Sequence, residues 1–351
     1  MSNEKNQGEQ VSRRKFLGSG AAVAALSIVP FSYGFESAPS ASGEANPKSK
    51  FGGVQIGAIT YSWRSMPGGV DNVIKYCIES GINSIELMSN DVESSLGAPT
   101  NPMMSFPRPA PPAPAAPGAP AAPMQRPKLT PEQQELIAKF NVEMKAWRIA
   151  LPMSKVEEIR KKFDSAGINI HIVKYSPSQW SDEEIDYAFK SAKVLGAKGV
   201  CEEIGEAACK KLAPFAEKHG MYAIFHQHMQ FATPGFSYDT FAAISPAIRF
   251  NFDSGHFFGS TGIDPITIIE KYHDRIFSIH IKDKTGPKTE PANLNQVWGQ
   301  GQMPLAEVLL YIKKKKYPIY CDIELEYDIK PWSNAVKEVK TCVEYARQIL
   351  I

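Results

Sequence analysis

The 351-residue sequence lacks any large excess of one charge, because 39 lysines and arginines face 37 aspartates and glutamates. It also lacks a Cys-x-x-Cys pair, which makes a redox or zinc motif of that kind unsupported. The near-neutral balance argues against a basic face that grips a phosphate backbone, so no nucleic acid partner is expected. Five scattered cysteines are expected to be small core residues: Cys77, Cys201, Cys209, Cys321 and Cys342.

No apolar run in the sequence reaches the roughly 20 residues that a spanning helix needs. Near the N-terminus, Arg13 and Arg14 precede an apolar segment, 16–31, that Gly and Ser interrupt. This pattern predicts a twin-arginine-type export signal over 1–35 and a periplasmic or otherwise exported protein, with a retained membrane anchor as the alternative. Removing four basic and two acidic residues with this segment leaves 35 of each sign.

A linker over 36–50, rich in Ser, Ala and Pro, precedes one expected domain over 51–351. Strand-like and helix-like stretches alternate through this domain, and no glycine-rich phosphate-binding fingerprint follows the first strand. The eight expected strands are 54–60, 82–88, 168–174, 197–203, 221–228, 247–253, 276–282 and 319–326. Repeated strand and helix units imply parallel strands, so the sequence predicts an α/β fold, a (β/α)8 TIM barrel. An open doubly wound sheet is the alternative.

One Pro/Ala-rich stretch, 97–128, interrupts the pattern after the second strand and is expected to be a disordered insertion. Its position places it at the C-terminal face of the barrel, either as a lid or docking arm or as a passive insertion. The next stretch, 130–152, begins with a capping-type pattern and predicts a helix that returns to the barrel.

Carboxylates and imidazoles gather where the expected strands end. These residues are His226, His228, His256 and His280, with Glu86, Glu202, Glu203, Asp253, Asp283, Glu324 and Glu326. Strand ends of a barrel converge on one mouth, and residues i and i+2 of a strand share a face. A mixture of imidazole and carboxylate suits Mn, Zn, Co, Fe or Ni better than Ca. We therefore expect one divalent metal ion, with Mn, Zn or Co preferred. A buried ion-pair network without metal is the alternative.

The motifs HQH, FDSGH, SIHIKD and DIELEY, on expected strands five to eight, resemble those of the xylose isomerase-like TIM barrel family of sugar phosphate isomerases and epimerases. The resemblance runs from about Phe51 to the C-terminus, without the Pro/Ala-rich stretch. It implies one divalent metal held by His226, Asp253, His280 and Glu324. The best-known epimerases have glutamate at the position of His226, which leaves Glu203 as a substitute ligand.

The resemblance implies removal of a carbon-bound proton beside a carbonyl. A metal that binds the carbonyl oxygen and a neighbouring hydroxyl stabilises the resulting enediolate, while a base takes the proton and an acid returns it. We expect His228 and Glu324 in these roles, with Glu326 as the alternative carboxylate. The residues expected to bind substrate are His256, Lys282, Glu86 and Trp63. For Lys282 a salt bridge, and for Trp63 a packing role, stay open.

The sequence thus predicts a metal-dependent carbohydrate isomerase or epimerase with a small-molecule carbohydrate substrate. A lyase acting on a 3-keto-glycoside is the chemical alternative, which export favours because phosphorylated sugars are unusual substrates outside the cytoplasm. A non-catalytic sugar-binding barrel is a further alternative, and an apurinic endonuclease of the same family is disfavoured by the neutral charge. No stable membrane span is expected, and an oligomer is left open.

Overall fold

The computed structural model describes residues 46–106 and 129–351. The predicted export signal, residues 36–45 of the predicted linker and residues 107–128 of the predicted insertion lie outside the described residues. Within the described ranges, no helix combines the length and the apolar character that crossing a membrane requires.

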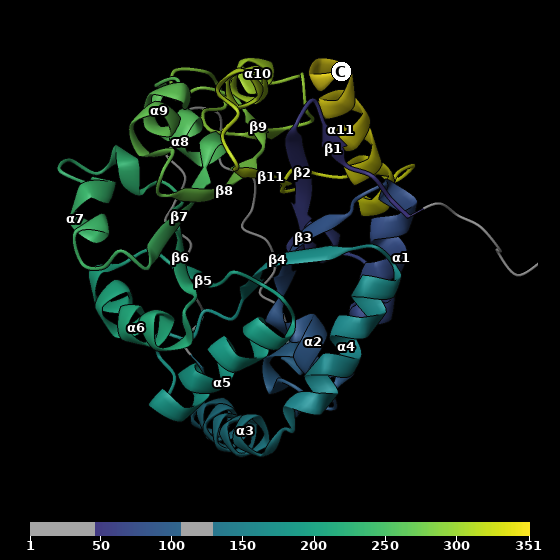
Figure 1. Cartoon of the computed structure of the whole chain (residues 1–351), viewed down its shortest axis with the longest axis vertical. Helices are drawn as coiled ribbons and strands as arrows, with labels where there is room; N and C mark the ends of the chain where they lie inside the picture. Colours follow the sequence, from purple (N-terminus) through teal and green to yellow (C-terminus); the bar gives the residue numbers. More distant parts are fainter. Residues whose placement is uncertain (1–45, 107–128) are drawn as a thin grey trace, which may run out of the picture. The chain divides into compact units, whose positions relative to one another are not determined.

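Eight parallel strands close into a barrel, because β2 pairs with β11 on one side and with β3 on the other. The order around the barrel is β2, β11, β8, β7, β6, β5, β4, β3. Figure 1 shows these strands around the centre, with helices outside them. The predicted (β/α)8 barrel is confirmed, and each expected strand overlaps an observed one. The barrel strands are β2 Val54–Ile59, β3 Ser84–Met88, β4 Asn169–Lys174, β5 Gly199–Glu203, β6 Tyr222–His226, β7 Ile248–Asp253, β8 Ile276–Ile281 and β11 Tyr320–Ile323.

Three two-residue strands complete the described strands. β1, Lys50–Phe51, pairs antiparallel with β2 at the start of the barrel. β9, Asp283–Lys284, pairs antiparallel with β10, Asn295–Gln296, in the connection after β8. This small ribbon gives the segment that follows β8 a fixed backbone.

The helices begin and end where the sequence supplies caps. Thr130 and Gln133 form a capping box at α3, and Gly81 and Gly220 end α1 and α6 in the left-handed conformation that glycine adopts without strain. The helices are α1 Val70–Ser80, α2 Ser89–Ser95, α3 Pro131–Ala150, α4 Met153–Ser165, α5 Asp182–Val194, α6 Glu206–His219, α7 Tyr238–Ala242, α8 Ser254–Thr261, α9 Ile266–Tyr272, α10 Leu305–Lys315 and α11 Ala335–Leu350. Three 3-10 helices are η1 Thr60–Trp63, η2 Pro102–Ser105 and η3 Gln230–Ala232.

Alternation along the strands divides the side chains between two environments. In β6, Phe225 belongs to the large hydrophobic core, whereas Ile224 packs with Ile172 and Cys201 in a separate, smaller cluster. The residue two positions after Ile224 on this strand is His226. All five cysteines are buried and unpaired, as the sequence predicted.

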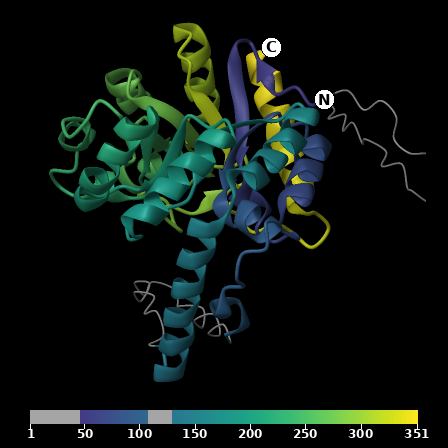
Figure 2. The ribbon, with the colours of Figure 1, turned by 60° about the horizontal axis from the view of Figure 1, so that its bottom comes forward.

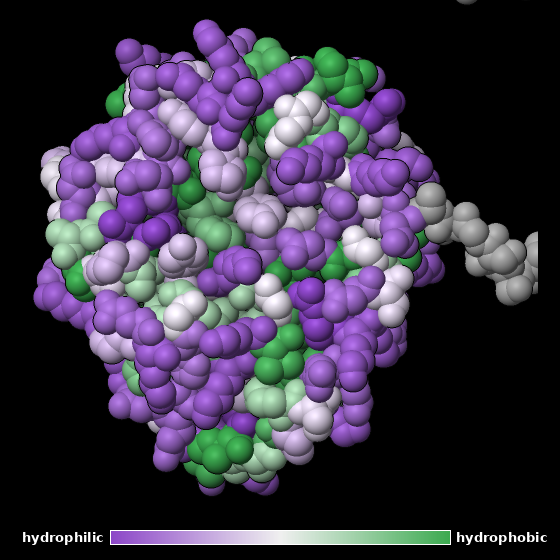
Figure 3. Space-filling model, viewed as in Figure 1, coloured by the Kyte–Doolittle hydropathy of each residue, from purple (hydrophilic) through white to green (hydrophobic). Residues whose placement is uncertain are grey.

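Helix α3 extends away from the ring of strands and helices (Figure 2). Its C-terminal end is tied to neighbouring elements by Arg148, whose guanidinium lies 2.8 Å from Glu93 and 3.0 Å from Glu184. The predicted helix after the Pro/Ala-rich stretch is therefore confirmed. On the face seen in Figure 3, hydrophilic side chains interrupt the hydrophobic areas.

Candidate metal centre

Four predicted ligands meet at the C-terminal ends of the barrel strands. His226 and Asp253 are the last residues of β6 and β7, His280 is in β8, and Glu324 follows β11. One ligand atom from each lies within 4.8 Å of the other three, and all four residues are buried. Consecutive parallel strands thus bring two imidazoles and two carboxylates to one point.

Asp253 shows how the local sequence builds this point. Its Oδ1 accepts a hydrogen bond of 2.7 Å from the backbone N–H of His256, so Asp253 is the N-cap of α8. The side chain of Gln227 holds the backbone of Asp253 at both groups, donating to its carbonyl at 2.8 Å and accepting from its N–H at 3.0 Å. One carboxylate oxygen is therefore used by the helix, and Oδ2 faces the cluster.

His280 is held on both ring nitrogens. Its Nδ1 lies 2.8 Å from Glu324 Oε2 and its Nε2 lies 2.8 Å from Glu86 Oε2, which also accepts from Asn251. Burial opposes the charged form, but Glu324 and Glu86 raise the pKa of His280 well above its usual value. The sequence assigned Glu86 to substrate binding, whereas the structure places it fully buried against His280. There it can orient the ring, as carboxylates behind metal-bound histidines do.

One atom without a partner fits a metal. His226 Nδ1 is buried and makes no hydrogen bond to any described residue, and the buried Asp253 Oδ2 faces only the Lys282 ammonium, at 2.8 Å. Burial lowers the pKa of His226 well below its usual value, which keeps the imidazole neutral with a free lone pair. Buried polar atoms are rarely left unpaired without a reason. A neutral imidazole nitrogen and a carboxylate oxygen are donors that divalent transition metals bind.

Lys282 supplies a cation at the same point. Its Nζ lies 2.8 Å from Asp253 Oδ2, 2.7 Å from Glu324 Oε2 and 2.7 Å from Glu326 Oε2. Its side chain passes Gly255, where a Cβ would lie 2.2 Å from Lys282 Cγ, so FDSGH requires glycine there. Burial opposes the charge of Lys282, but the carboxylates raise its pKa. This is the ion-pair network that the sequence left open, and it shares its oxygens with the candidate metal ligands.

A second group of polar side chains surrounds the mouth. His228 Nε2 lies 3.0 Å from Glu203, whose other oxygen accepts from Lys174, and half of the His228 side chain is exposed. The hydrogen bond that His228 donates to the Glu203 carboxylate raises the pKa of His228. His256 lies between the rings and carboxylates of this group, 5.1 Å from His228 by ring centroids and 3.4 Å from Glu326 by Nε2. Burial opposes the charged form of Glu326, but His256 and Lys282 stabilise that form and lower the pKa of Glu326 to about 2.

Glu203, the substitute ligand, lies beside the four-residue cluster and not within it. It forms an overlapping group of possible ligands with His226 and His228. The sequence placed His228 and Glu326 on strands, but β6 ends at His226 and β11 ends at Ile323. Both side chains nevertheless reach the mouth from the loops that follow.

Trp63 is the last residue of η1, which follows β2, and it is buried, with its ring 5.9 Å from that of Tyr76. The structure does not bring it into contact with the cluster. Sequence reasoning missed three residues of the site: Asn251, Lys174 and Lys284. Asn251 is two residues before Asp253 on the same strand, and Lys174 is the last residue of β4, so strand alternation and strand ends were available signals.

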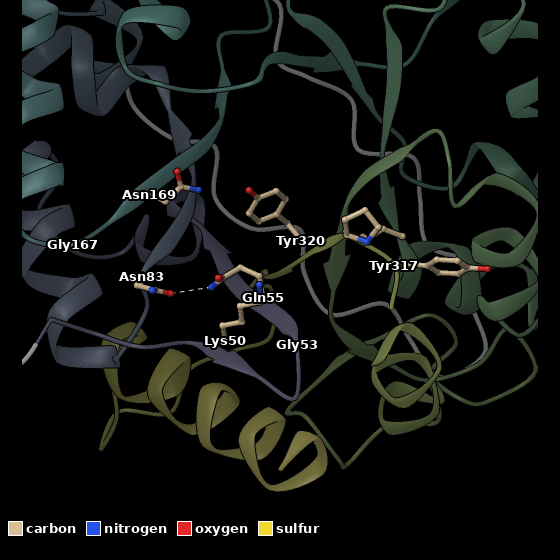
Figure 4. Close-up of a pocket in the computed structure, with 10 residues that line it drawn as sticks. Lys50, Gly53, Gln55, Asn83, Gly167, Asn169, Tyr317 and Tyr320 are labelled. Atoms are coloured by element: carbon tan, nitrogen blue, oxygen red, sulfur yellow. Dashed lines mark hydrogen bonds between the residues drawn. The ribbon is translucent and has the colours of Figure 1, made fainter. Parts of the chain in front are cut away.

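The opposite end of the barrel holds a different hollow, of about 360 Å³. Its polar lining comes from the starts of strands and the residues before them, including Gln55, Asn83, Asn169 and Tyr320 (Figure 4). Gln55 donates to Asn83 at 2.9 Å, so these amides partly satisfy each other. Lys50 is the one charged residue among the lining residues, so this hollow lacks the cluster of charges found at the mouth.

Residues 192–348 match the sequence model of the xylose isomerase-like TIM barrel family, and this stretch contains all four candidate ligands. A search of curated proteins finds no match. Among solved structures, the chain resembles the probable 3-DHS dehydratase AsbF from Bacillus anthracis, with 12% identity over 83% of this chain and 98% of that chain and a TM-score of 0.54.

Two further solved structures resemble the chain. One is a sugar phosphate isomerase/epimerase from Parabacteroides distasonis ATCC 8503, with 16% identity over 85% of this chain and 96% of that chain and a TM-score of 0.51. The other is the IolI protein with a bound zinc atom, with 14% identity over 85% and 98% and a TM-score of 0.54. At these identities the likeness establishes a xylose isomerase-like fold and nothing finer.

Proposed function

We propose that the chain is a metal-dependent carbohydrate isomerase or epimerase of the xylose isomerase-like TIM barrel family. The observation that carries the proposal is the convergence of His226, Asp253, His280 and Glu324 on one buried point, with His226 Nδ1 unpartnered among the described residues. The family match over 192–348 and the zinc bound by the IolI protein support it.

These four residues would hold the metal, with Glu86 orienting His280. When bound there, a divalent cation supplies stabilisation of negative charge that develops on a substrate oxygen. His228 and Glu326 are the proposed proton-transfer pair, since both reach the mouth from loops, whereas Glu324 is one of the four proposed metal ligands. His256 lies between them and would hold a substrate hydroxyl.

Solvent exchange tests this proposal directly. The metal-loaded protein should exchange the proton beside the carbonyl of a ketose or aldose with deuterium from the solvent, because proton removal precedes isomerisation or epimerisation. His228→Gln should lose most of this exchange. Gln134→Ala, on the exposed face of α3, is the matched control and should keep it. A wild-type protein that binds sugar but exchanges no proton would contradict the proposal.

A lyase that acts on a 3-keto-glycoside is the second candidate, and the Arg13 and Arg14 pair is the observation that favours it. We propose that this pair directs export by a twin-arginine route, away from phosphorylated sugars. Changing both to Lys should retain the precursor in the cytoplasm, which cell fractionation measures. Unchanged fractionation would argue against this route.

A further inference from the structure

A second hollow, of about 300 Å³, adjoins the mouth and shares Glu326 with it. Its walls come from the segment around β10 and from the segment that follows β11. The lining residues are Leu294, Asn295, Gln296, Val297, Gln300, Glu326, Tyr327, Asp328 and Lys330. The volume lies at the lower end of the range of about 300 to 1,000 Å³ that small-ligand pockets have.

Hydrogen bonds fix the walls of this hollow. Asp283 Oδ2 accepts from the backbone N–H of Gly299 at 2.8 Å and of Gly301 at 2.9 Å, which shapes the loop that carries Gln300. The Asn295 side chain donates to the backbone carbonyl of Glu326 at 3.4 Å, so the two walls are joined. A rigid wall is what a specific binding site requires, because little ordering is left to do when the ligand binds.

One polar atom of the hollow lacks a partner. Asn295 Oδ1 is buried and forms no hydrogen bond with any described residue, although Asn295 Nδ2 is used. A buried carbonyl oxygen of this kind costs free energy until a donor reaches it. A hydroxyl group is such a donor.

The charges of the hollow decide which ligand class fits. Glu326 and Asp328 face a single cation, Lys330, among the lining residues, so a phosphate or carboxylate group would meet net negative charge. Amide side chains at Asn295, Gln296 and Gln300 can bond hydroxyls, and Val297 and Tyr327 offer apolar surface. This mixture of amide and apolar groups matches a neutral sugar ring, which has hydroxyls on its edge and C–H groups on its faces.

The hollow is close enough to the mouth to serve one substrate. Glu326 Oε2 lies 2.7 Å from Lys282 Nζ, which lies 2.7 Å from Glu324 Oε2. A sugar unit at the metal centre and a unit in the hollow would therefore sit on either side of Glu326. We propose that the hollow binds a second, neutral glycosyl unit, so that the substrate is a glycoside or disaccharide; this inference rests on the proposed function of the metal centre.

Calorimetry on the zinc-loaded protein tests the inference with maltose, cellobiose and lactose against glucose and galactose. At least one disaccharide should bind about tenfold more tightly than its component monosaccharides, a difference that one or two good hydrogen bonds supply. Asn295→Ala and Gln300→Ala should each reduce this ratio toward one and leave monosaccharide binding unchanged. Gln300→Trp, at an exposed position, should block the hollow without disturbing the core.

Gln134→Ala on α3 is the matched control and should preserve the ratio. Equal binding of mono- and disaccharides by the wild type, or an unchanged ratio in both Gln300 variants, would overturn the second glycosyl site and leave the metal-centre proposal standing. A zinc-loaded protein that binds none of these sugars would overturn both. The protein could instead bind glucose 6-phosphate more tightly than glucose. If Lys330→Ala abolished that preference, the hollow would be an anion site in place of a glycosyl site.

Discussion

The two ends of the barrel interior each contain a buried histidine, and they differ in what is left unbonded around it. Below the metal centre, His171 is bonded on both nitrogens, to Ser84 and Asp322 at 2.9 Å each, and its ring stacks on Tyr320 at 4.2 Å. At the mouth, His280 is equally well bonded, but its neighbour His226 keeps an unpartnered nitrogen. A histidine inside a barrel is thus no evidence for a metal by itself, whereas an unpartnered nitrogen among carboxylates is.

The lower end has unpartnered atoms of its own among the described residues, including Asp322 Oδ1. Asp322 also forms, with Glu86 and His280, a group whose possible ligand atoms lie within 4.8 Å of one another. That group contains His280 as its one imidazole, and both nitrogens of His280 are bonded to carboxylates. The cluster at the mouth adds His226, whose Nδ1 is unpartnered among the described residues, so the comparison favours the mouth for the proposed metal.

The largest expected effect comes from removing a carboxylate at either end. Asp253→Ala should abolish metal binding and turnover, because it removes a ligand that no neighbouring oxygen replaces. Asp322→Ala should keep the metal but lower the free energy of unfolding by about 1 to 3 kcal/mol, because it leaves the buried Nε2 of His171 without its hydrogen-bond partner. Metal analysis and urea unfolding of both variants separate the two ends. Loss of metal in Asp322→Ala would indicate that the metal site lies at the lower end of the barrel.

The two histidines of the HQH motif sharpen the comparison within the mouth. His228→Gln should keep metal and fold while turnover falls by about 10² to 10⁴, the usual contribution of a proton-transfer group. His226→Gln should instead weaken metal retention. Kinetics and elemental analysis of the pair decide the roles. If His228→Gln loses metal and His226→Gln keeps it, the two assignments are reversed.

Sequence patterns predicted the barrel because the strand and helix alternation is strong and the strand ends follow from it. They also placed the four candidate ligands among eleven strand-end residues; the family resemblance selected the four, and the structure brings them together. They left a salt bridge of Lys282 open but did not predict that it would lie among three carboxylates, because its direction depends on the space left by Gly255 in α8. The burial of Glu86 escaped prediction for the same reason, since packing across the barrel has no local signal, whereas a packing role for Trp63 had been left open.

Lys284 at the mouth gives an intermediate effect that depends on pH. Its side chain is buried, its ammonium makes one hydrogen bond among the described residues, to His256 at 3.4 Å, and burial, with Lys282 nearby, lowers its pKa to about 8. Between pH 8 and about 10.4 the unfolded chain holds the proton that the folded chain has lost, so stability should rise with pH by up to about 3 kcal/mol. Below pH 8 Lys284 is protonated in both the folded and the unfolded state, so burial of its charge lowers the stability of the protein by the full amount.

Lys284→Met should therefore be more stable than the wild type at pH 7 and lose this advantage by pH 10. Urea unfolding at the two pH values measures the difference, with exposed Lys288→Met as the control from the same loop. Parallel pH curves for wild type and Lys284→Met would show that the burial of this ammonium has no cost.

Two glycines give the smallest expected effects and test one end against the other. A Cβ at Gly57 would lie 2.1 Å from Asp322 Oδ1, and a Cβ at Gly255 would lie 2.2 Å from Lys282 Cγ. Alanine at either position should cost about 1 to 3 kcal/mol through overpacking. Only Gly255→Ala should also change metal affinity, because it displaces Lys282. Calorimetric metal titration of both variants, showing equal changes, would contradict the separation of the two ends.

The most direct test of the metal centre is the metal content of the purified wild-type protein, measured by elemental analysis alongside its turnover. The arrangement of His226, Asp253, His280 and Glu324 predicts one divalent transition metal per chain, with turnover lost when a chelator removes it and restored when Zn, Mn or Co is returned. A protein that is fully active with no bound metal would contradict the metal centre and leave Lys282 as the cation that these carboxylates were built to hold.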